Sequence, residues 1–484
     1  MGRSRGARLA TGVAVVVLVA TVAGCRETWR SELVTGNEAG TDSGNDQSPW
    51  GTISEDGTKV AFATLADDLG PTDTNGTADV YVRDLATGGN TLVSVDATGT
   101  DSGNDWSGSP VLSHDGTKVA FVSYADDLGP SDTNLVDDVY VRDLVAGTTT
   151  LVSVDAPGWG AGAVGGVDAL FGPDDTQVLF RGPASQLFRR DLLAGITTLV
   201  SAPAPGTPPD AGSSYEATWS PDGTRVAFTS SAALVALDTN DRTDVYVRDL
   251  LAGTTTLASV NATGTNGGND QSSDPVFHPG GTAVAFMSQG TDFGPPDPAA
   301  GTEILLRDLV AGTTTLVTAQ PSGIGANGQS SLAAFSPDGT RIAFQASAAS
   351  FGPVDTNGTF DTYVRDLTTG VTTLVSANEA GTGSGNRASG GAMWNEAGTK
   401  VVFASFASDL GPTDGNTQKD VYVRDLGLGV TSLVSATPGG EAIGGTEPLA
   451  YVGGRVLYST RSGALGPNDT NGEPDLYLAT VDPS

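Results

Sequence analysis

The chain has 484 residues and carries 24 Lys and Arg against 56 Asp and Glu, a formal net charge of −32 at pH 7. Phosphate backbones repel such an acidic protein, so nucleic acid is excluded as an expected partner. A single cysteine excludes an intramolecular disulfide, and two histidines leave little material for histidine-based catalysis.

The first 24 residues are expected to be a lipoprotein signal peptide. Three arginines precede an apolar segment, 9–22, which is too short for a comfortable membrane span. It ends in Val22-Ala23-Gly24-Cys25, which resembles a bacterial lipobox. An ordinary signal peptide with a chance cysteine is the alternative. We expect cleavage before Cys25, lipidation of that cysteine, and a mature chain, 25–484, held on the outer face of the bacterial cell membrane.

The mature chain is an internal repeat with a step of about 58 residues. Its clearest phrase is Asp-Val-Tyr-Val-Arg-Asp-Leu. A Ser-Pro-Asp-Gly turn and a Val-Ala-Phe run precede the phrase, and Thr-Leu-Val-Ser follows it. Full and weaker copies of the phrase occupy 79–85, 138–144, 187–192, 244–250, 303–309, 361–367, 420–426 and 475–481.

Each repeat predicts four short strands, a to d: strand a leads into the Pro-Asp-Gly turn, Val-Ala-Phe forms b, Val-Tyr-Val-Arg forms c, and Thr-Leu-Val-Ser forms d. Eight such units predict an all-β fold, a single eight-bladed β-propeller of four-stranded antiparallel blades, with seven blades as the alternative. The eighth unit ends after strand c, and residues 31–35 offer an unmatched strand d. We therefore expect the N-terminal strand to close the ring.

The repeats resemble those of TolB-like propellers, which carry the same Ser-Pro-Asp-Gly turn, Ile/Val-Ala-Phe strand and Asp-Ile/Val-Tyr-Val strand. The resemblance covers essentially all of 25–484 and implies the fold, with little said about function. The chain departs from TolB itself, because it lacks an extra N-terminal domain and has a lipobox. No α/β-hydrolase pattern follows the propeller.

The loops between strands b and c repeat the spacing Asp-x-Asn-x-x-x-Asp, with oxygen ligands placed as a chain wraps Ca²⁺. The motif resembles a truncated form of the calcium loops in integrin-type propeller blades, with proline at the first acidic ligand in most copies. Turn chemistry is the alternative, since Asp and Asn stabilise turns through side-chain to backbone bonds. The candidate ligands are Asp73, Asn75, Asp79, Asp132, Asn134, Asp138, Asp238, Asn240, Asp244, Asp355, Asn357, Asp361, Asp414, Asn416, Asp420, Asp469, Asn471 and Asp475. The third and fifth units lack the motif, and the third has lost the loop.

Two further patterns suggest blade packing. The repeated Arg-Asp of strand c, as in Arg83-Asp84, favours an ion pair between neighbouring blades. Trp50, Trp219 and Trp394 are predicted at the end of strand a, packed between blades rather than forming a sugar platform.

These observations favour a non-enzymatic binding or scaffold propeller, monomeric, lipid-anchored and stabilised by Ca²⁺ if the loops bind it. Its expected partner is a protein or a cell-envelope polymer, and its contact with the membrane is the N-terminal lipid. The alternative is a polysaccharide-active lyase or hydrolase that uses the central mouth of the propeller. A deep mouth with convergent carboxylates and aromatics would favour the enzyme, and a shallow acidic rim would favour the binder.

Overall fold

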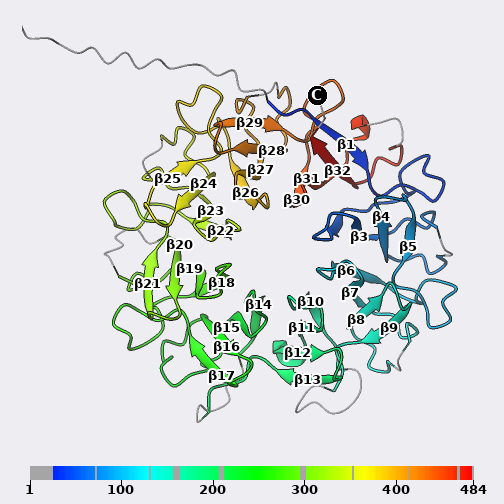
Figure 1. The fold of residues 1–484 in the computed structure, drawn as a ribbon, viewed down its shortest axis with the longest axis horizontal. Helices are drawn as coiled ribbons and strands as arrows, with labels where there is room; N and C mark the ends of the chain where they lie inside the picture. The colour runs from blue at the N-terminus through cyan, green and yellow to red at the C-terminus, as the bar shows by residue number, and fades with distance from the viewer. Residues whose placement is uncertain are drawn as a thin grey trace, which may run out of the picture.

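The computed structural model describes residues 26–70, 73–129, 132–155, 164–205, 212–294, 301–351, 354–411, 414–465 and 469–481. Within these ranges the strands form eight antiparallel sheets of four, arranged as blades around a central axis (Figure 1). The predicted all-β, eight-bladed propeller is confirmed, with eight blades and not seven. Residues 1–25, which include the predicted signal peptide and Cys25, lie outside the described residues. The part of the chain that is described contains no helix long and apolar enough to cross a membrane.

Strand a is innermost in every blade, and strand d lies at the outer rim (Figure 1). Blades one to eight have as strand a β2 (Trp50–Ile53), β6 (Ser107–Leu112), β10 (Val167–Phe171), β14 (Ser214–Trp219), β18 (Ser272–Phe277), β22 (Ser330–Phe335), β26 (Ser389–Trp394) and β30 (Glu447–Val452). Strands b are β3 (Lys59–Thr64), β7 (Lys118–Ser123), β11 (Gln177–Arg181), β15 (Arg225–Ser230), β19 (Ala283–Ser288), β23 (Arg341–Ala346), β27 (Lys400–Ser405) and β31 (Arg455–Thr460).

Strands c are β4 (Asp79–Asp84), β8 (Asp138–Asp143), β12 (Leu187–Asp191), β16 (Asp244–Asp249), β20 (Glu303–Asp308), β24 (Asp361–Asp366), β28 (Asp420–Asp425) and β32 (Asp475–Val481). Strands d are β5 (Asn90–Leu92), β9 (Thr148–Leu151), β13 (Ile196–Leu199), β17 (Thr254–Leu257), β21 (Thr313–Leu316), β25 (Thr372–Leu374), β29 (Val430–Leu433) and, for blade eight, β1 (Trp29–Leu33). Two 3₁₀ turns, η1 (Pro183–Ser185) and η2 (Gly463–Leu465), interrupt the b–c loops of blades three and eight.

The core lies between the blades. Phe62 of β3 and Tyr81 of β4 are fully buried, with their rings stacked at 6.2 Å. Ala61 and Val80 on the same strands pack against Val119 of blade two. Because neighbouring blades cover both faces of each sheet, strands b and c are apolar runs without polar alternation.

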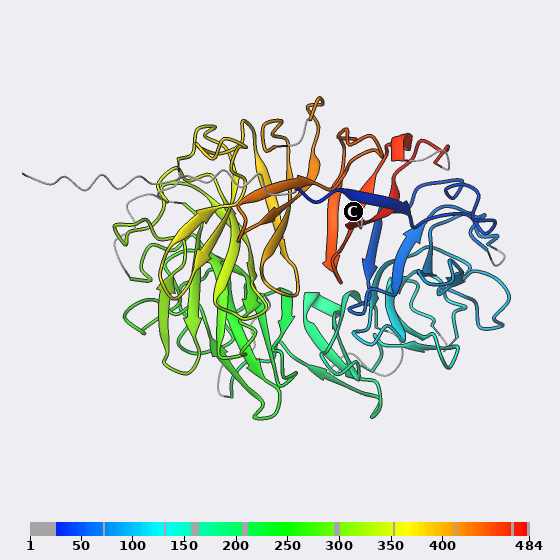
Figure 2. The same ribbon diagram turned by 45° about the horizontal axis from the view of Figure 1, so that its top comes forward.

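The N-terminal strand closes the ring as predicted. β1 pairs antiparallel with β32, with Leu33 opposite Tyr477, and Figure 2 shows it lying across the last blade. The Thr35 hydroxyl then donates to Asp475 at 2.6 Å. Ser94 makes the same bond to Asp79 in blade one. Residues 29–35, from the opposite end of the chain, therefore supply strand d of blade eight. Thr35 supplies the hydroxyl group that Ser94 supplies after strand d of blade one.

The expected ion pair between blades is wrong for nearly all of the repeated Arg-Asp pairs. Arg142 donates instead to Thr149 on strand d of its own blade, at 3.0 Å. Asp143 accepts backbone N–H groups in the c–d turn. Among the described residues only Arg190 of this set lies near a carboxylate, 4.0 Å from Asp155. The guanidinium group at this position is closer to strand d of its own blade than to a carboxylate of a neighbouring blade.

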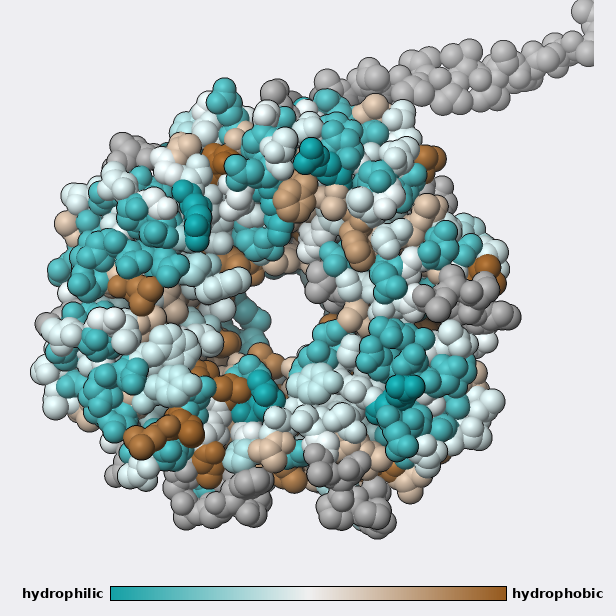
Figure 3. Space-filling model, turned by 180° about the vertical axis from the view of Figure 1, so that it is seen from behind, coloured by the Kyte–Doolittle hydropathy of each residue, from teal (hydrophilic) through white to brown (hydrophobic). Residues whose placement is uncertain are grey.

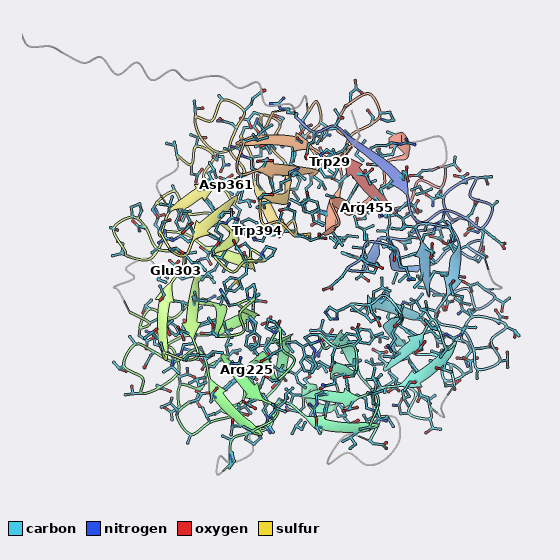
Figure 4. The ribbon with its side chains drawn as sticks, in the orientation of Figure 1. Trp29, Arg225, Glu303, Asp361, Trp394 and Arg455 are labelled. Atoms are coloured by element: carbon cyan, nitrogen blue, oxygen red, sulfur yellow. The ribbon has the colours of Figure 1, made fainter. Side chains whose placement is uncertain are left out.

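A different arginine joins adjacent blades. Arg225 at the start of β15 donates to the Gly281 carbonyl at 2.6 Å. Arg455 at the start of β31 donates to the Gly57 carbonyl at 2.9 Å, which links the last blade to the first (Figure 4). Each bond satisfies a turn carbonyl of the following blade with a charged donor.

The tryptophan prediction holds for two positions and fails for the third. Trp219 and Trp394 end their strands and are buried, and the Trp394 indole donates to the Ala334 carbonyl of the preceding blade at 2.9 Å. Trp50 instead begins β2 and is 64% exposed. Blade one has Ile53 where the other two have tryptophan, so Trp50 belongs to a different position of the repeat.

Candidate functional site in the central channel

The b–c loops bring their predicted Asp and Asn residues together as a hydrogen-bonded cluster. In blade one, the Asn75 amide nitrogen donates to Asp79 and to the Gly103 carbonyl, both at 2.7 Å. The Asn75 oxygen accepts the Thr77 backbone N–H at 2.6 Å. Gly103 precedes blade two, so the amide ties the loops of two blades together. Corresponding bonds from the asparagine to the last aspartate occur at Asn240, Asn357, Asn416 and Asn471.

The last aspartate of the motif is buried in these clusters. Asp79 has no exposed surface and accepts the Ser94 hydroxyl at 2.5 Å. Burial, opposed by that hydrogen bond, raises the pKa of Asp79 to about 7. The same cause, burial first, raises the pKa to about 7 in Asp138, Asp244, Asp361 and Asp475, and raises that of Asp420.

The first aspartate of the motif is held differently. The Tyr422 hydroxyl donates to Asp414 at 3.0 Å, and the Tyr477 hydroxyl donates to Asp469 at 2.7 Å. Asp132 and Asp238 have tyrosine partners in the same way. Asp73 accepts the Ser102 hydroxyl, and Asp355 accepts the Ser384 hydroxyl. Donors within the protein therefore meet one oxygen or more of these aspartates, whereas Asp138 Oδ2, Asp355 Oδ2 and Asp469 Oδ1 are buried without a hydrogen bond from any described residue.

This arrangement does not fit a cation as it stands. A Ca²⁺ ligand must present oxygen, whereas Asn75 presents its amide nitrogen to Asp79. The orientation is set by the turn, because reversing the amide would bring its N–H₂ against the Thr77 N–H. No group of three or more His, Cys, Asp or Glu placed to hold a metal occurs in the described ranges. Five of the prolines at the first ligand position, at 71, 130, 353, 412 and 467, lie outside those ranges.

In blade three, a glutamine makes the corresponding hydrogen bonds without a carboxylate. The b–c connection of this blade is the short segment 182–186, as the sequence predicted. Gln186 accepts the Ser201 hydroxyl at 2.8 Å and donates to the Gly212 carbonyl at 2.6 Å. One neutral amide thus makes the bonds that Asp79 and Asn75 share in blade one. Calcium binding by the other loops stays a prediction, which chelation tests.

A second set of residues faces the central channel. Every strand a from blade two onward has an irregular register. At this bulge Ser109, Asp168, Glu216 and Asp274 are exposed and have φ values of 50 to 56°, a left-handed conformation that is costly for side chains other than Gly, Asn and Asp. Gly391 takes the position in blade seven. The space-filling view shows the channel as an open hole through the ring (Figure 3).

Acidic residues occupy this position in three consecutive blades, three to five. Asp168 accepts Arg181 Nε at 2.6 Å. Glu216 accepts the Thr229 hydroxyl at 2.8 Å and the Asp274 backbone N–H at 3.0 Å, both through Oε2. The Asp274 carboxyl is also hydrogen-bonded to Glu216, and burial followed by the charge of Glu216 raises the pKa of Asp274.

A crevice of about 510 Å³ opens beside Asp168 and Glu216, between blades three and four. Leu170, Leu179 and Leu187 contribute its apolar lining, and Asp168, Arg181, Tyr215 and Glu216 its polar lining. Small residues leave the space: Ala169 and Ala217 stand where blades two and five have the buried Pro110 and Pro275.

Sequence reasoning missed this set. The carboxylates do not form a local motif, since they lie in different repeats. The available signal was the position two residues after the buried Ser of strand a, as at Ser214 and Ser272. Comparing that position across the repeats reveals three acids in a row.

The histidines stand apart from these carboxylates. His114 Nδ1 lies 2.8 Å from Asp175, and His278 accepts the Gly280 N–H while its Nε2 bonds to the Gly339 carbonyl at 3.1 Å. Both histidines occupy a–b turns and link them to the turns of the next blade.

Comparison with known proteins finds no matching family model and no matching curated protein. Solved structures do match. An oligogalacturonate lyase in complex with manganese is 16% identical, with a TM-score of 0.45, over 77% of this chain and 88% of that one. A prolyl endopeptidase is 14% identical, with a TM-score of 0.47, over 88% of this chain and 55% of that one. A protein described as TolB from Agrobacterium tumefaciens is 15% identical, with a TM-score of 0.35, over 72% of this chain and 98% of that one. The neighbours are thus propeller proteins, one of them TolB-like, and at these identities they assign no activity to this chain.

Proposed function

We propose that the chain is a lipid-anchored β-propeller that binds a ligand in its central channel without converting it. The one-sided acidic wall formed by Asp168, Glu216 and Asp274 carries this proposal. A ring built only for stability has no need of exposed acids at the same position of three consecutive blades, one of them a glutamate in a left-handed conformation. The ligand is a protein or a cell-envelope polymer, and the propeller acts as a monomer.

The anchor rests on the lipobox that ends at Cys25. β1 begins four residues later, at Trp29, so the lipid joins the ring at its closing blade. The tether is too short to let the propeller move far from the membrane. The channel therefore opens in the extracellular space close to the bilayer.

Binding is favoured over glycoside hydrolysis by the spacing of the carboxyl groups. A retaining glycosidase needs its two carboxyl groups about 5–5.5 Å apart, and an inverting one about 6.5–9.5 Å. Asp274 and Glu216 are hydrogen-bonded to each other, which is closer than either mechanism uses. Asp168 is engaged in an ion pair with Arg181 at 2.6 Å.

The test separates binding from catalysis. Purified protein is incubated with cell-envelope polysaccharides and with surface proteins from the source cells, and both retention and new reducing ends or peptides are measured. We expect retention without products, and weaker retention by the double variant Glu216→Gln/Asp274→Asn. Products released by the wild type and not by the double variant would establish the polysaccharide-active alternative or another enzyme.

A matched control removes the same charge elsewhere. Glu38 and Glu441 are exposed loop residues away from strand a, so Glu38→Gln/Glu441→Gln should be retained like the wild type. Equal loss of retention by both double variants would show that net charge, and not the channel, holds the ligand.

A further inference from the structure

Seven of the eight blades carry an arginine just before the last aspartate of strand c. In each of them the guanidinium group donates to the side-chain oxygen of a threonine or asparagine on strand d of the same blade, at 2.9–3.1 Å. Arg365 of blade six also donates to the Ala319 carbonyl, which follows strand d of blade five, at 3.2 Å. Neutral oxygens therefore hold these arginines near the boundary with the preceding blade.

Blade eight has Ala479 where the other blades have this arginine. Ala479 lies opposite Ser31 in the pairing of β32 with β1. Arg142 lies opposite Thr149 at the same register in blade two. The Ser31 hydroxyl accepts the Tyr458 hydroxyl at 2.7 Å and keeps a lone pair for a second donor. Blade eight therefore retains the acceptor on strand d but has no arginine of its own on strand c.

A crevice of about 560 Å³ opens at this place, on the outer rim between blades seven and eight. β1, the outermost strand of blade eight, forms one side of it (Figure 1). Ser31 and Ala436 are part of its lining. Ala436 follows strand d of blade seven as Ala319 follows strand d of blade five, so it has the position of the carbonyl that accepts Arg365. Residues that carry both kinds of oxygen acceptor therefore line the crevice.

The remaining lining suits the stem of a long side chain. Trp29, Leu433, Pro438 and Leu465 give the crevice apolar surface. The methylene groups of an arginine pack on surface of this kind, and its planar guanidinium group stacks on aromatic rings.

The charged residues of the lining already have partners of opposite charge. Arg26 is bonded to Glu379 at 2.5 Å, and Glu27 forms an ion pair with the lysine that begins β27. Arg30 lies 3.8 Å from Glu32. The crevice therefore has no excess of positive charge to select an anion, and the seven internal arginines show that neutral oxygens are enough to hold a guanidinium group.

Other ligand classes match these acceptors less well. An alkyl chain would cover the Ser31 hydroxyl and the Ala436 carbonyl without giving either a hydrogen bond. The ammonium group of a lysine is more strongly hydrated than a guanidinium group and lacks its planar fork of donors. An arginine side chain has both the stem for the apolar lining and donors for the two oxygens.

We propose that this crevice binds an arginine side chain supplied by a partner protein, in the place that the ring's own arginines occupy in the other seven blades. The site lies on the outer rim, away from the central channel. It therefore adds a second binding surface to the proposed function and does not depend on it.

The probe is the peptide acetyl-Ala-Arg-Ala-amide, titrated at 0.15 M salt while saturation-transfer NMR follows binding, so that long-range attraction to the acidic ring is screened. One matched peptide carries citrulline, which keeps the shape of arginine and loses its charge. Another carries lysine, which keeps the charge and loses the planar fork of donors. We expect both to bind at least tenfold more weakly than the arginine peptide.

Variants locate the site. Ala479→Arg gives blade eight its own arginine and should weaken peptide binding at least tenfold. Ser31→Ala removes the acceptor and should weaken binding about tenfold, whereas Ser31→Thr, with the residue that blades two to seven have at this position, should bind like the wild type. The controls are Thr149→Ala, at the same position in blade two, and Glu216→Gln/Asp274→Asn, in the channel. Both should bind like the wild type.

Thermal unfolding of each variant separates a loss of binding from a loss of fold. The two Ser31 variants give the same decision as Ala479→Arg without adding a buried side chain. Full binding by a folded Ala479→Arg would place the peptide outside the crevice, and equal binding of the citrulline peptide would rule out recognition of the charge. Either result would overturn the proposal.

Three further outcomes would also overturn it. Tenfold tighter binding of ethylguanidine would identify a small guanidine compound, and not a protein, as the ligand. Tenfold tighter binding of the arginine peptide by Arg30→Ala would show that the chain's own Arg30 fills the crevice. Absence of binding by the wild type would leave the rim without a site, while the proposal for the channel would stand or fall on its own retention assay.

Discussion

In five of the six b–c loop motifs, the asparagine amide donates a hydrogen bond to the last aspartate. In blade four, the Asn240 amide donates to Asp244 and to the Gly268 carbonyl, both at 2.7 Å. It offers hydrogen-bond donors to a buried carboxyl group and joins that group to the loop of the next blade. Because the donor is part of the chain, this bond forms with folding.

Removing this amide should destabilise the ring. Asn240→Ala leaves a buried oxygen of Asp244 without its donor, and we expect it to lower the free energy of unfolding by about 1–3 kcal/mol. Denaturant unfolding measures the loss. Asn104→Ala is the matched control, because the Asn104 amide donates to the exposed Asp126, and it should cost less. Equal losses would contradict a structural role for the buried bond.

The buried aspartates should make the protein more stable in mild acid. The pKa of Asp79 and of four equivalent groups is about 7 in the folded chain, against about 4 in an unfolded one. Between these values the folded state binds more protons, so the free energy of unfolding falls as pH rises. Groups with a lowered pKa, such as Asp338 at about 2, change stability only below this window.

We therefore expect a higher melting temperature at pH 5 than at pH 8, measured by circular dichroism. Asp244→Asn should reduce the difference, since it removes one of the titrating groups. A melting temperature that rises from pH 5 to pH 8 would contradict the account.

The same melting experiment tests calcium. If the loops bind Ca²⁺, millimolar Ca²⁺ raises the melting temperature and EDTA lowers it, because the ion binds the folded state. The hydrogen-bonded geometry predicts no change with either addition. A rise of several degrees with Ca²⁺ would show that the amides turn away to admit the ion.

Two tryptophans at different positions of strand a should respond very differently to truncation. Trp394→Ala opens a cavity between blades and should cost about 3–5 kcal/mol. Trp50→Ala removes an exposed side chain and should change stability by less than about 0.5 kcal/mol. Chemical denaturation measures the free energy of unfolding of both variants. A large decrease for Trp50→Ala would show that this side chain is packed.

At the scale of strands, the repeat made most of the fold predictable. The Pro-Asp-Gly turns, the Val-Ala-Phe runs and the Asp-Val-Tyr-Val runs each recur with their own turn chemistry, so the strands and the closing segment could be placed by counting. The bulge in strand a was not predictable in this way. Its register depends on packing around the channel, and the first blade, with Trp50 in its four-residue strand, lacks it.

The crevice was also beyond sequence reasoning. It arises where Ala169 and Ala217, from different repeats, line the same blade boundary, at a position where blades two and five have proline. Neither alanine is unusual in its own repeat. Only the ring places the two side by side, along with Glu216 at the channel.

Closure by β1 predicts the effect of one hydroxyl. Thr35→Val keeps the shape of the side chain and removes its bonds to Asp475 and to the Leu476 N–H. We expect the free energy of unfolding to fall by about 1–3 kcal/mol, as Ser94→Ala should do in blade one. A loss for Ser94→Ala alone would mean that the N-terminal strand contributes little to the last blade.

At the scale of the whole molecule, closure of the ring by β1 would place the proposed lipid anchor beside the last blade. Arg455 links the last blade to the turn at Gly57 of the first, and β1 supplies the outer strand of the same last blade. Cys25→Ser should leave this ring folded and release it into the soluble fraction of cells. Membrane association equal to that of the wild type, measured by fractionation, would contradict lipid anchoring.

The most direct test of the central claim, that the channel beside blades three to five is the ligand site, is a crystal structure with the ligand that the retention assay identifies. The account predicts electron density for that ligand in the channel, beside Glu216 and Asp274. Density confined to the b–c loops or the outer rim, with the channel unchanged, would contradict it.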